Sequence, residues 1–184
     1  MTVSSNSSSK HVMLSYQWND QKLVSEIYQY LKKNNLSVWM DIQGGMKANI
    51  YECMAEGVEN ASVIVCFMTP TYQASENCQQ ELQFAKTQRV PIVACRLTHN
   101  WKPTGWLGLI TAGLLMVDLK DITNSNFERK VNKLLEHIHL TLDMKTKSQL
   151  VSSSSHTNTE FDQDHSTSKY VSKTSRGIIK VTHS

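Results

Sequence analysis

Long apolar runs are missing from this sequence of 184 residues. No stretch approaches the roughly 18 consecutive apolar residues that a membrane-spanning helix needs. The first residues, MTVSSNSSSK, contain no apolar segment of the kind that marks a secretion signal. Because 40% of the residues are hydrophobic, the chain can still form one core. We therefore expect one soluble, cytoplasmic domain without a membrane span.

Paired cysteines and clustered positive charge are also lacking. The four cysteines show no CxxC spacing and no accompanying histidine pair, which argues against a metal site or a disulfide framework. Cys66 and Cys95 lie in apolar stretches, where reduced thiols pack as small hydrophobic groups, as is typical of a reducing compartment. The net charge is only +3, and the 19 Lys and Arg residues are scattered. Nucleic acid is therefore not an expected partner.

The two ends of the chain differ in composition from its middle. Residues 1–9 are rich in serine, and residues 143–184 are poor in apolar side chains and rich in Ser, Thr and His. Such composition cannot bury enough apolar surface to offset the entropy of ordering. The sequence therefore predicts a disordered leader over 1–9, a domain over 10–142 and a flexible tail over 143–184.

Between the two ends, strand patterns alternate with helix patterns. Two of the strand-like segments are nearly continuous apolar runs, as expected of parallel strands buried on both faces. The expected strands are residues 11–16, 36–41, 61–68, 90–97 and 113–119. Amphipathic segments follow most of them. This order predicts an α/β fold with a flavodoxin-like, doubly wound five-stranded parallel sheet and helices on both faces.

One carboxylate lies on the apolar face of a predicted helix. In the segment NCQQELQFA, a turn of about 100° per residue places Glu81 within the arc of Cys78 and Leu82. Gln79 and Gln83 fall on the opposite side. A surface glutamate would be expected with the glutamines, so Glu81 faces the body of the protein. It is either a chemical group in a cleft or a structural one, held by a basic partner or by the helix dipole.

Ligands of open α/β sheets bind beyond the carboxyl ends of the strands. The segment after the first strand, YQWND, contains no glycine, which excludes the GxGxxG loop of dinucleotide-binding domains. It is also too bulky for a flavodoxin-type phosphate loop. The third strand closes with Met68 and Thr69, where a phosphoacceptor receiver domain would need an aspartate. All three of these common uses of the fold are therefore excluded.

Four motifs resemble those of a Toll/interleukin-1 receptor (TIR) domain. They are SYQWND after the first strand, VWMD closing the second, FMTPTYQASENCQQEL around the third, and GWLGLI before the fifth. The resemblance covers about residues 10–140. It implies either a scaffold that assembles signalling complexes or an enzyme that cleaves NAD⁺. The enzymes use a glutamate early in the helix after strand three, a position that matches Glu81.

The resemblance also implies roles for the residues around Glu81 in binding NAD⁺ as a substrate, with no cofactor and no metal. Tyr16 and Trp18 are candidates to stack on the nicotinamide or adenine ring, or to plug the strand end. Asp41 is a candidate to bind a ribose hydroxyl, or it only starts the following loop. Ser75 binds ribose or caps the helix.

Two departures from the family pattern fall in the same group of residues. Gln17 and Trp18 stand where many of the enzymes carry basic residues, and Asn77 stands where some carry a tryptophan. We keep Gln17 and Asn77 among the expected substrate-binding residues. These departures concern residues expected to set the affinity for the substrate.

The loop after the second strand is the expected surface for self-association or for binding other TIR domains. This loop, IQGGMKAN, contains Gly44, Gly45, Met46 and Lys47. In enzymes of the family it lies near the glutamate of another subunit. The expected function is thus an NAD⁺ glycohydrolase that forms ADP-ribose or a cyclic isomer in immune or cell-death signalling. The alternative is a non-enzymatic TIR adaptor in which Glu81 is structural.

Overall fold

The computed structural model describes residues 10–41 and 50–154. Within these ranges, five parallel strands form one sheet with the order β2-β1-β3-β4-β5. The strands are β1 (His11–Ser15), β2 (Val38–Trp39), β3 (Ala61–Met68), β4 (Ile92–Arg96) and β5 (Met116–Asp118). The predicted five-stranded parallel α/β fold is confirmed, because each of the five segments expected to be a strand contains one of these strands.

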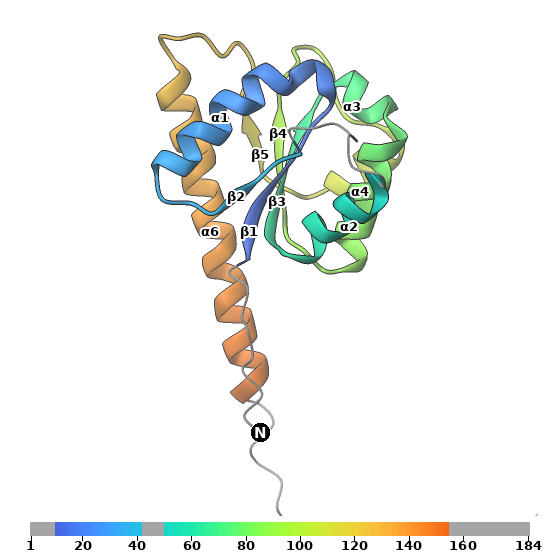
Figure 1. Cartoon of the computed structure of the whole chain (residues 1–184), viewed down its shortest axis with the longest axis vertical. Coiled ribbons are helices and arrows are strands. Elements are labelled where there is room, and N and C mark those ends of the chain that lie inside the picture. The colour runs from blue at the N-terminus through green and yellow to red at the C-terminus, as the bar shows by residue number, and fades with distance from the viewer. Residues whose placement is uncertain (1–9, 42–49, 155–184) are drawn as a thin grey trace, which may run out of the picture.

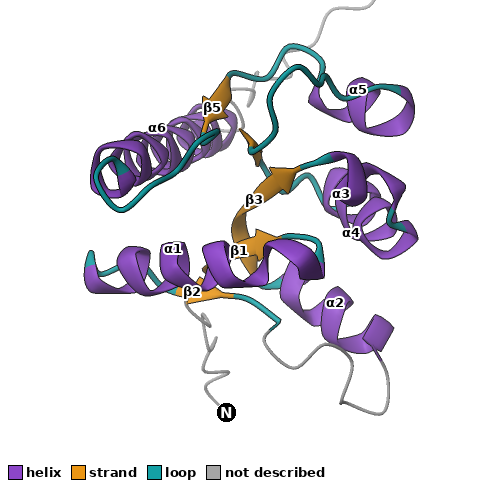
Figure 2. Cartoon of the chain, turned by 90° about the horizontal axis from the view of Figure 1, so that it is seen from above, coloured by secondary structure: helices purple, strands orange, loops and turns teal. Residues whose placement is uncertain are grey.

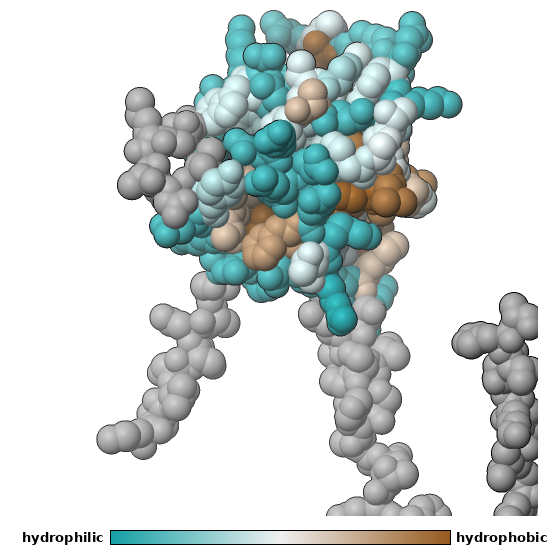
Figure 3. All heavy atoms as spheres, turned by 90° about the vertical axis from the view of Figure 1, so that its right-hand side faces the viewer, coloured by the Kyte–Doolittle hydropathy of each residue, from teal (hydrophilic) through white to brown (hydrophobic). Residues whose placement is uncertain are grey.

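Helices cover both faces of the sheet (Figures 1 and 2). Helices α1 and α6 pack on one face, and α2, α3, α4 and α5 pack on the other. The helices are α1 (Gln21–Lys33), α2 (Ile50–Glu59), α3 (Pro70–Ala74), α4 (Glu76–Thr87), α5 (Gly105–Thr111) and α6 (Phe127–Ser154), with a 3-10 turn, η1 (Trp18–Asp20). The outer surface of the α2–α5 side is mostly hydrophilic, with apolar side chains gathered in limited areas (Figure 3).

The central strand β3 contributes to two hydrophobic cores. Val63, Val65 and Phe67 are buried against α1 and α6, whereas Ile64 and Cys66 are buried against the helices of the other face. Successive side chains of a strand point to opposite faces, so a nearly continuous apolar run fills both cores.

The strand order changes direction between β1 and β3. The chain moves from β1 outward to β2, and then returns past β1 to β3 and on to β4 and β5. The loops that follow β1 and β3 therefore leave the sheet in opposite directions and open a crevice at the carboxyl edge of the sheet. Ligands of open α/β sheets bind at such a crevice.

Helix α6 extends beyond the domain boundary expected at residue 142. It continues to Ser154, so a helix covers the first part of the range for which a flexible tail is predicted. Leu142 packs against the core, and the Lys145 ammonium donates a hydrogen bond of 3.1 Å to the Ser62 carbonyl oxygen. These two contacts hold the helix against the domain just beyond residue 142. The division into leader, domain and tail otherwise remains a prediction.

Trp39 packs rather than pointing to solvent, and it closes the space above Gly57 in α2. Its ring stacks on the His11 imidazole with centroids 5.9 Å apart, and His11 Nε2 lies 2.9 Å from the Gly57 carbonyl oxygen. A Cβ atom at Gly57 would lie 2.9 Å from two atoms of the Trp39 ring and 3.2 Å from Met13 Cε. The helix can approach the sheet this closely only because residue 57 has no side chain.

Gly57→Ala is therefore expected to lower the stability of the fold, although alanine favours a helix. Displacing the Trp39 ring should cost about 1–3 kcal/mol. The higher helix propensity of alanine should return about 1 kcal/mol, so the net loss of stability is expected to be up to about 2 kcal/mol. Thermal unfolding followed by circular dichroism measures the change, with Glu59→Ala at the exposed end of the same helix as control. A Gly57→Ala protein that melts above the parent would show that the ring moves aside at little cost.

Candidate active site

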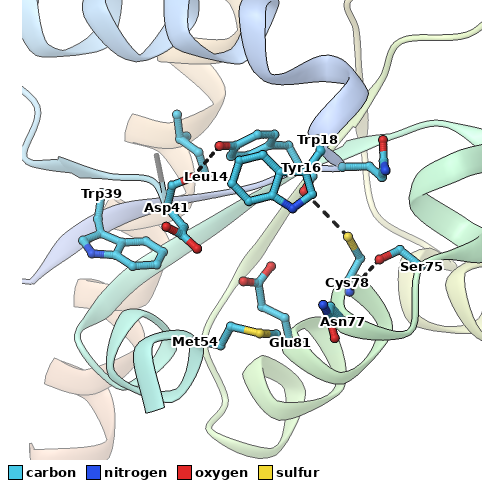
Figure 4. A pocket seen from close by; sticks show the side chains of 11 residues that line it. Leu14, Tyr16, Trp18, Trp39, Asp41, Met54, Ser75, Asn77, Cys78 and Glu81 are labelled. Atoms are coloured by element: carbon cyan, nitrogen blue, oxygen red, sulfur yellow. Dashed lines mark hydrogen bonds between the residues drawn. The ribbon is translucent and has the colours of Figure 1, made fainter. Parts of the chain in front are cut away.

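A cleft opens where the sequence predicts a site, at the carboxyl ends of β1 and β2 beside α4 (Figure 4). All seven residues expected to act on or bind the substrate line it: Tyr16, Gln17, Trp18, Asp41, Ser75, Asn77 and Glu81. Apolar side chains and one thiol complete the wall: Leu14, Trp39, Met54 and Cys78. The cleft has a volume of about 80 Å³, or about 570 Å³ when its open mouth is included.

Helix α4 directs Glu81 into this cleft. The helix begins at Ser75, whose hydroxyl accepts a hydrogen bond of 3.3 Å from the Cys78 amide, so the cap is Ser75. Cys78 and Leu82 are buried against the sheet. Glu81, at the edge of the same stripe, is partly buried, and its carboxylate points into the cleft (Figure 4). The orientation predicted from the helical period is confirmed.

One buried hydroxyl group binds the carboxylate from the inside, and a second binds the first. The Ser15 hydroxyl, at the end of β1, donates a short hydrogen bond to Glu81 Oε2. The Tyr72 hydroxyl lies 2.7 Å from Ser15 Oγ. Tyr72 is fully buried, and its backbone is held by Thr69, which caps the short helix α3 and accepts a bond of 3.1 Å from the Tyr72 amide. Neither Ser15 nor Tyr72 was among the site residues expected from the sequence.

The pKa of Glu81 is raised to about 7. Burial of the carboxyl group is the main cause, since removal from water disfavours the charged form. The hydrogen bond from Ser15 acts in the opposite direction, and the negative charge of Asp41 raises the pKa further. Glu81 is therefore mostly ionised above neutral pH and mostly protonated below it.

Glu81 forms no structural ion pair with any residue in the described part of the chain. Among residues 10–41 and 51–147, no lysine, arginine or histidine lies within ion-pair distance of its carboxylate. None of the described side chains that line the cleft is basic. The carboxylates of Asp41 and Glu81 both point into the cleft (Figure 4), so its described wall is acidic.

The sequence of residues 12–135 matches the family model of the TIR domain. The chain belongs to the TIR domain family. No protein with a curated description matches it in sequence.

Two solved structures are similar in fold to this TIR domain. The first is the TIR domain of the Toll-related receptor TRR-2 from Hydra magnipapillata, with a TM-score of 0.53 and 14% identity over 70% of this chain and 97% of that chain. The second is the structure of the TIR domains of the activated Roq1 resistosome, which directly recognizes the pathogen effector XopQ. Its TM-score is 0.55, with 15% identity over 71% of this chain and 99% of that chain.

The aromatic wall of the TIR domain cleft is built by the segment after β1. The Tyr16 hydroxyl donates a hydrogen bond of 2.5 Å to the Asp41 carbonyl oxygen, which joins the ends of β1 and β2. Burial, with the charges of Asp41 and Glu81, raises the pKa of Tyr16 to about 12, so the phenol stays neutral. Trp18 packs edge-on to Tyr16, with centroids 6.0 Å apart, and is 43% exposed. Its ring is therefore accessible to a planar ligand at the mouth.

The remaining expected site residues are Gln17, Asn77 and those of the loop after β2. The Gln17 side chain accepts a hydrogen bond of 2.8 Å from the Asn19 amide and so caps η1. Asn77 lies inside the first turn of α4, because Ser75 is the cap. The expected interaction residues fall outside the described part of the chain: Gly44, Gly45, Met46 and Lys47.

Three further findings concern the whole described chain. In residues 10–41 and 50–154, no group of three or more His, Cys, Asp or Glu side chains is arranged to hold a metal ion. No described helix is long and apolar enough to cross a membrane. All four cysteines are described, and all are free thiols.

Proposed function

We propose that this TIR domain is a cytoplasmic NAD⁺ glycohydrolase. It cleaves the bond between nicotinamide and ribose and forms ADP-ribose or a cyclic isomer, in immune or cell-death signalling. The observation that carries the proposal is the state of Glu81. Its carboxylate points into a cleft, has no basic partner among the described residues, and titrates near neutral pH.

The chemistry needs little beyond such a carboxylate. The nicotinamide ring of NAD⁺ already carries a positive charge, so it leaves with the bonding electron pair and needs no proton. The ribosyl centre then becomes cationic, as in glycoside hydrolysis. The Glu81 anion stabilises this cation at short range, where excluded water strengthens the interaction. Water, or a nitrogen of the adenine ring, completes the reaction by bonding to the same carbon, and in hydrolysis water also gives up a proton.

The acidic wall suits one end of the substrate. Asp41 and Glu81 favour the cationic ring and the forming sugar cation, and the exposed Trp18 ring offers a stacking surface. The pyrophosphate is anionic, so it would lie toward the mouth, away from both carboxylates. A cleft of about 80 Å³ takes a ring but not a whole dinucleotide, because ligand pockets usually span about 300–1,000 Å³.

The small volume supports completion of the site by a second copy. We propose that self-association, or association with other TIR domains, through residues 42–49 supplies the missing wall. The Roq1 TIR domains, which are similar in fold, were solved as part of an assembly, the activated resistosome, and this supports the proposal.

Nicotinamide release by the concentrated protein tests the function. We expect release from NAD⁺ whose rate per molecule rises with protein concentration, because association would complete the site. Chromatography measures nicotinamide, and mass spectrometry separates ADP-ribose from a cyclic isomer. A preparation of Glu81→Gln serves as the blank for contaminating activity. A folded, self-associating protein that releases no nicotinamide would favour the adaptor instead.

A further inference from the structure

A chain of two buried hydroxyl groups extends from Glu81 into the interior. Ser15, the last residue of β1, is 1% exposed, and Tyr72 in α3 is fully buried. Neither lines the cleft, so neither is placed to touch a substrate there. Both nevertheless connect to the carboxylate that the cleft presents, through the bonds from Tyr72 to Ser15 and from Ser15 to Glu81.

The chemistry of the three groups sets the direction of the hydrogen bonds. An ionised carboxylate can only accept, so the single Ser15 proton goes to Glu81 Oε2. Ser15 Oγ must then accept the proton of the Tyr72 hydroxyl, 2.7 Å away. Burial raises the pKa of Tyr72 well above its ordinary value, so this phenol keeps its proton. The order is therefore Tyr72 to Ser15 to Glu81.

We infer that Ser15 and Tyr72 are positioning residues, because the ordered relay from Tyr72 through Ser15 holds one oxygen of Glu81 and leaves the other free for the substrate. The inference deepens the proposed function and rests on it for its catalytic meaning. A fixed orientation of a flexible carboxylate side chain raises the reaction rate when the carboxylate must stabilise a cation at one defined position. Tyr72 adds to this by fixing the direction of the Ser15 hydroxyl.

The relay also stabilises the ionised form of Glu81, which burial and the charge of Asp41 destabilise. The groups that interact with its charge come from several elements: Asp41 after β2, Tyr16 after β1, Cys66 in β3, Tyr72 in α3 and Cys78 in α4. Each of these groups is neutral or negative. Of the causes that shift the pKa of Glu81 within the described structure, only the Ser15 hydrogen bond lowers it.

Direct titration of Glu81 tests the relay without any substrate. Carbon-13 labelling of the glutamate carboxyl groups lets NMR follow each pKa, and the resonance missing from Glu81→Gln identifies Glu81. We expect Ser15→Ala to raise the pKa of Glu81 by about one unit or more, since a hydrogen bond to a charged group is lost. Tyr72→Phe, which keeps the ring, should raise it by a smaller amount.

Two control variants separate the relay from general effects of mutation. Ser15→Thr keeps a hydroxyl and should return the pKa of Glu81 toward the parent value. Ser62→Ala removes a partly buried serine hydroxyl from the neighbouring strand β3, where it bonds the His11 carbonyl oxygen, and should leave that pKa unchanged.

The pH profile of nicotinamide release supplies the catalytic readout. In the parent, release should rise with a midpoint near pH 7, where Glu81 ionises. In Ser15→Ala the midpoint should move to higher pH by the shift that NMR measures. For a shift of one unit, release at pH 7 falls about fivefold from the smaller ionised fraction alone. Loss of orientation should also lower the plateau at high pH.

The two readouts separate the relay from the function. If Ser15→Ala leaves the pKa of Glu81 unchanged, the relay is overturned whatever the activity. If the pKa moves but the parent releases no nicotinamide, the proposed function fails while the relay stands. If the pKa moves and the pH midpoint of release does not follow, the positioning role is overturned.

Discussion

Replacing Glu81 by glutamine should lower the rate of nicotinamide release by about 100-fold or more, the usual effect of removing a main electrostatic stabiliser. The amide keeps the shape of the side chain, and its oxygen can still accept the Ser15 hydroxyl. The negative charge next to the forming ribosyl cation is lost. Release should be compared at pH 8, where the carboxylate of the parent is mostly ionised.

The same helix offers a matched control for this substitution. Glu76 lies in the first turn of α4, exposed to solvent and outside the cleft. Glu76→Gln removes the same charge from the same helix and should leave the release rate near that of the parent. A Glu81→Gln protein that keeps the rate of the parent would show that another residue carries the reaction.

Glu81→Gln should also stabilise the fold at pH 8 and have much less effect at pH 5. The pKa of Glu81 is about 7 in the folded chain and near 4.5 when unfolded. Between pH 4.5 and pH 7 the folded state binds more protons at this group than the unfolded state does. The parent therefore loses stability as the pH rises through this range. The full shift corresponds to about 3 kcal/mol. Because the side chain is partly exposed, we expect a gain of about 1–3 kcal/mol at pH 8.

Denaturant unfolding of the two proteins at pH 5 and pH 8 measures this effect. The difference between variant and parent removes the contribution of other groups, such as Asp20, whose burial raises its pKa in both proteins. Glu76→Gln should show no comparable change between the two pH values. An equal stability difference at pH 5 and pH 8 would mean that Glu81 titrates at its ordinary pKa.

The two predictions concern the same charge. Among the described residues Glu81 has no basic partner, so its carboxylate, once ionised above about pH 7, costs stability without an evident structural benefit. Loss of stability at a functional site is the usual counterpart of activity. A more stable and inactive Glu81→Gln protein would be the expected combination for a catalytic residue.

The sequence was sufficient to predict the architecture and the cleft in which the candidate site lies. The apolar runs around 61–68 and 90–97 predict buried parallel strands, because both faces of such strands need apolar side chains. The helical period places Glu81 on the inward face of α4. Since the carboxyl ends of parallel strands meet at one edge, Tyr16 and Asp41 were expected near each other, and both line the cleft.

Ser15 shows which structural features a local sequence pattern predicts and which it does not. The two-residue period of β1 places Ser15 on the same face as Met13, which packs toward α4, so its direction was readable from the sequence. Its partners were not readable, because Glu81 lies 66 positions and Tyr72 57 positions further along the chain. Periodicity reports the face on which a side chain lies, but not which distant group meets it.

The sequence by itself determined the sheet, its helices and the inward carboxylate, because these depend on the period and composition of neighbouring residues. Only the tertiary structure decided the ionisation of that carboxylate and the hydroxyl groups that hold it. Those properties depend on desolvation and on hydrogen bonds between β1, α3 and α4, which come together only when the chain crosses over the sheet.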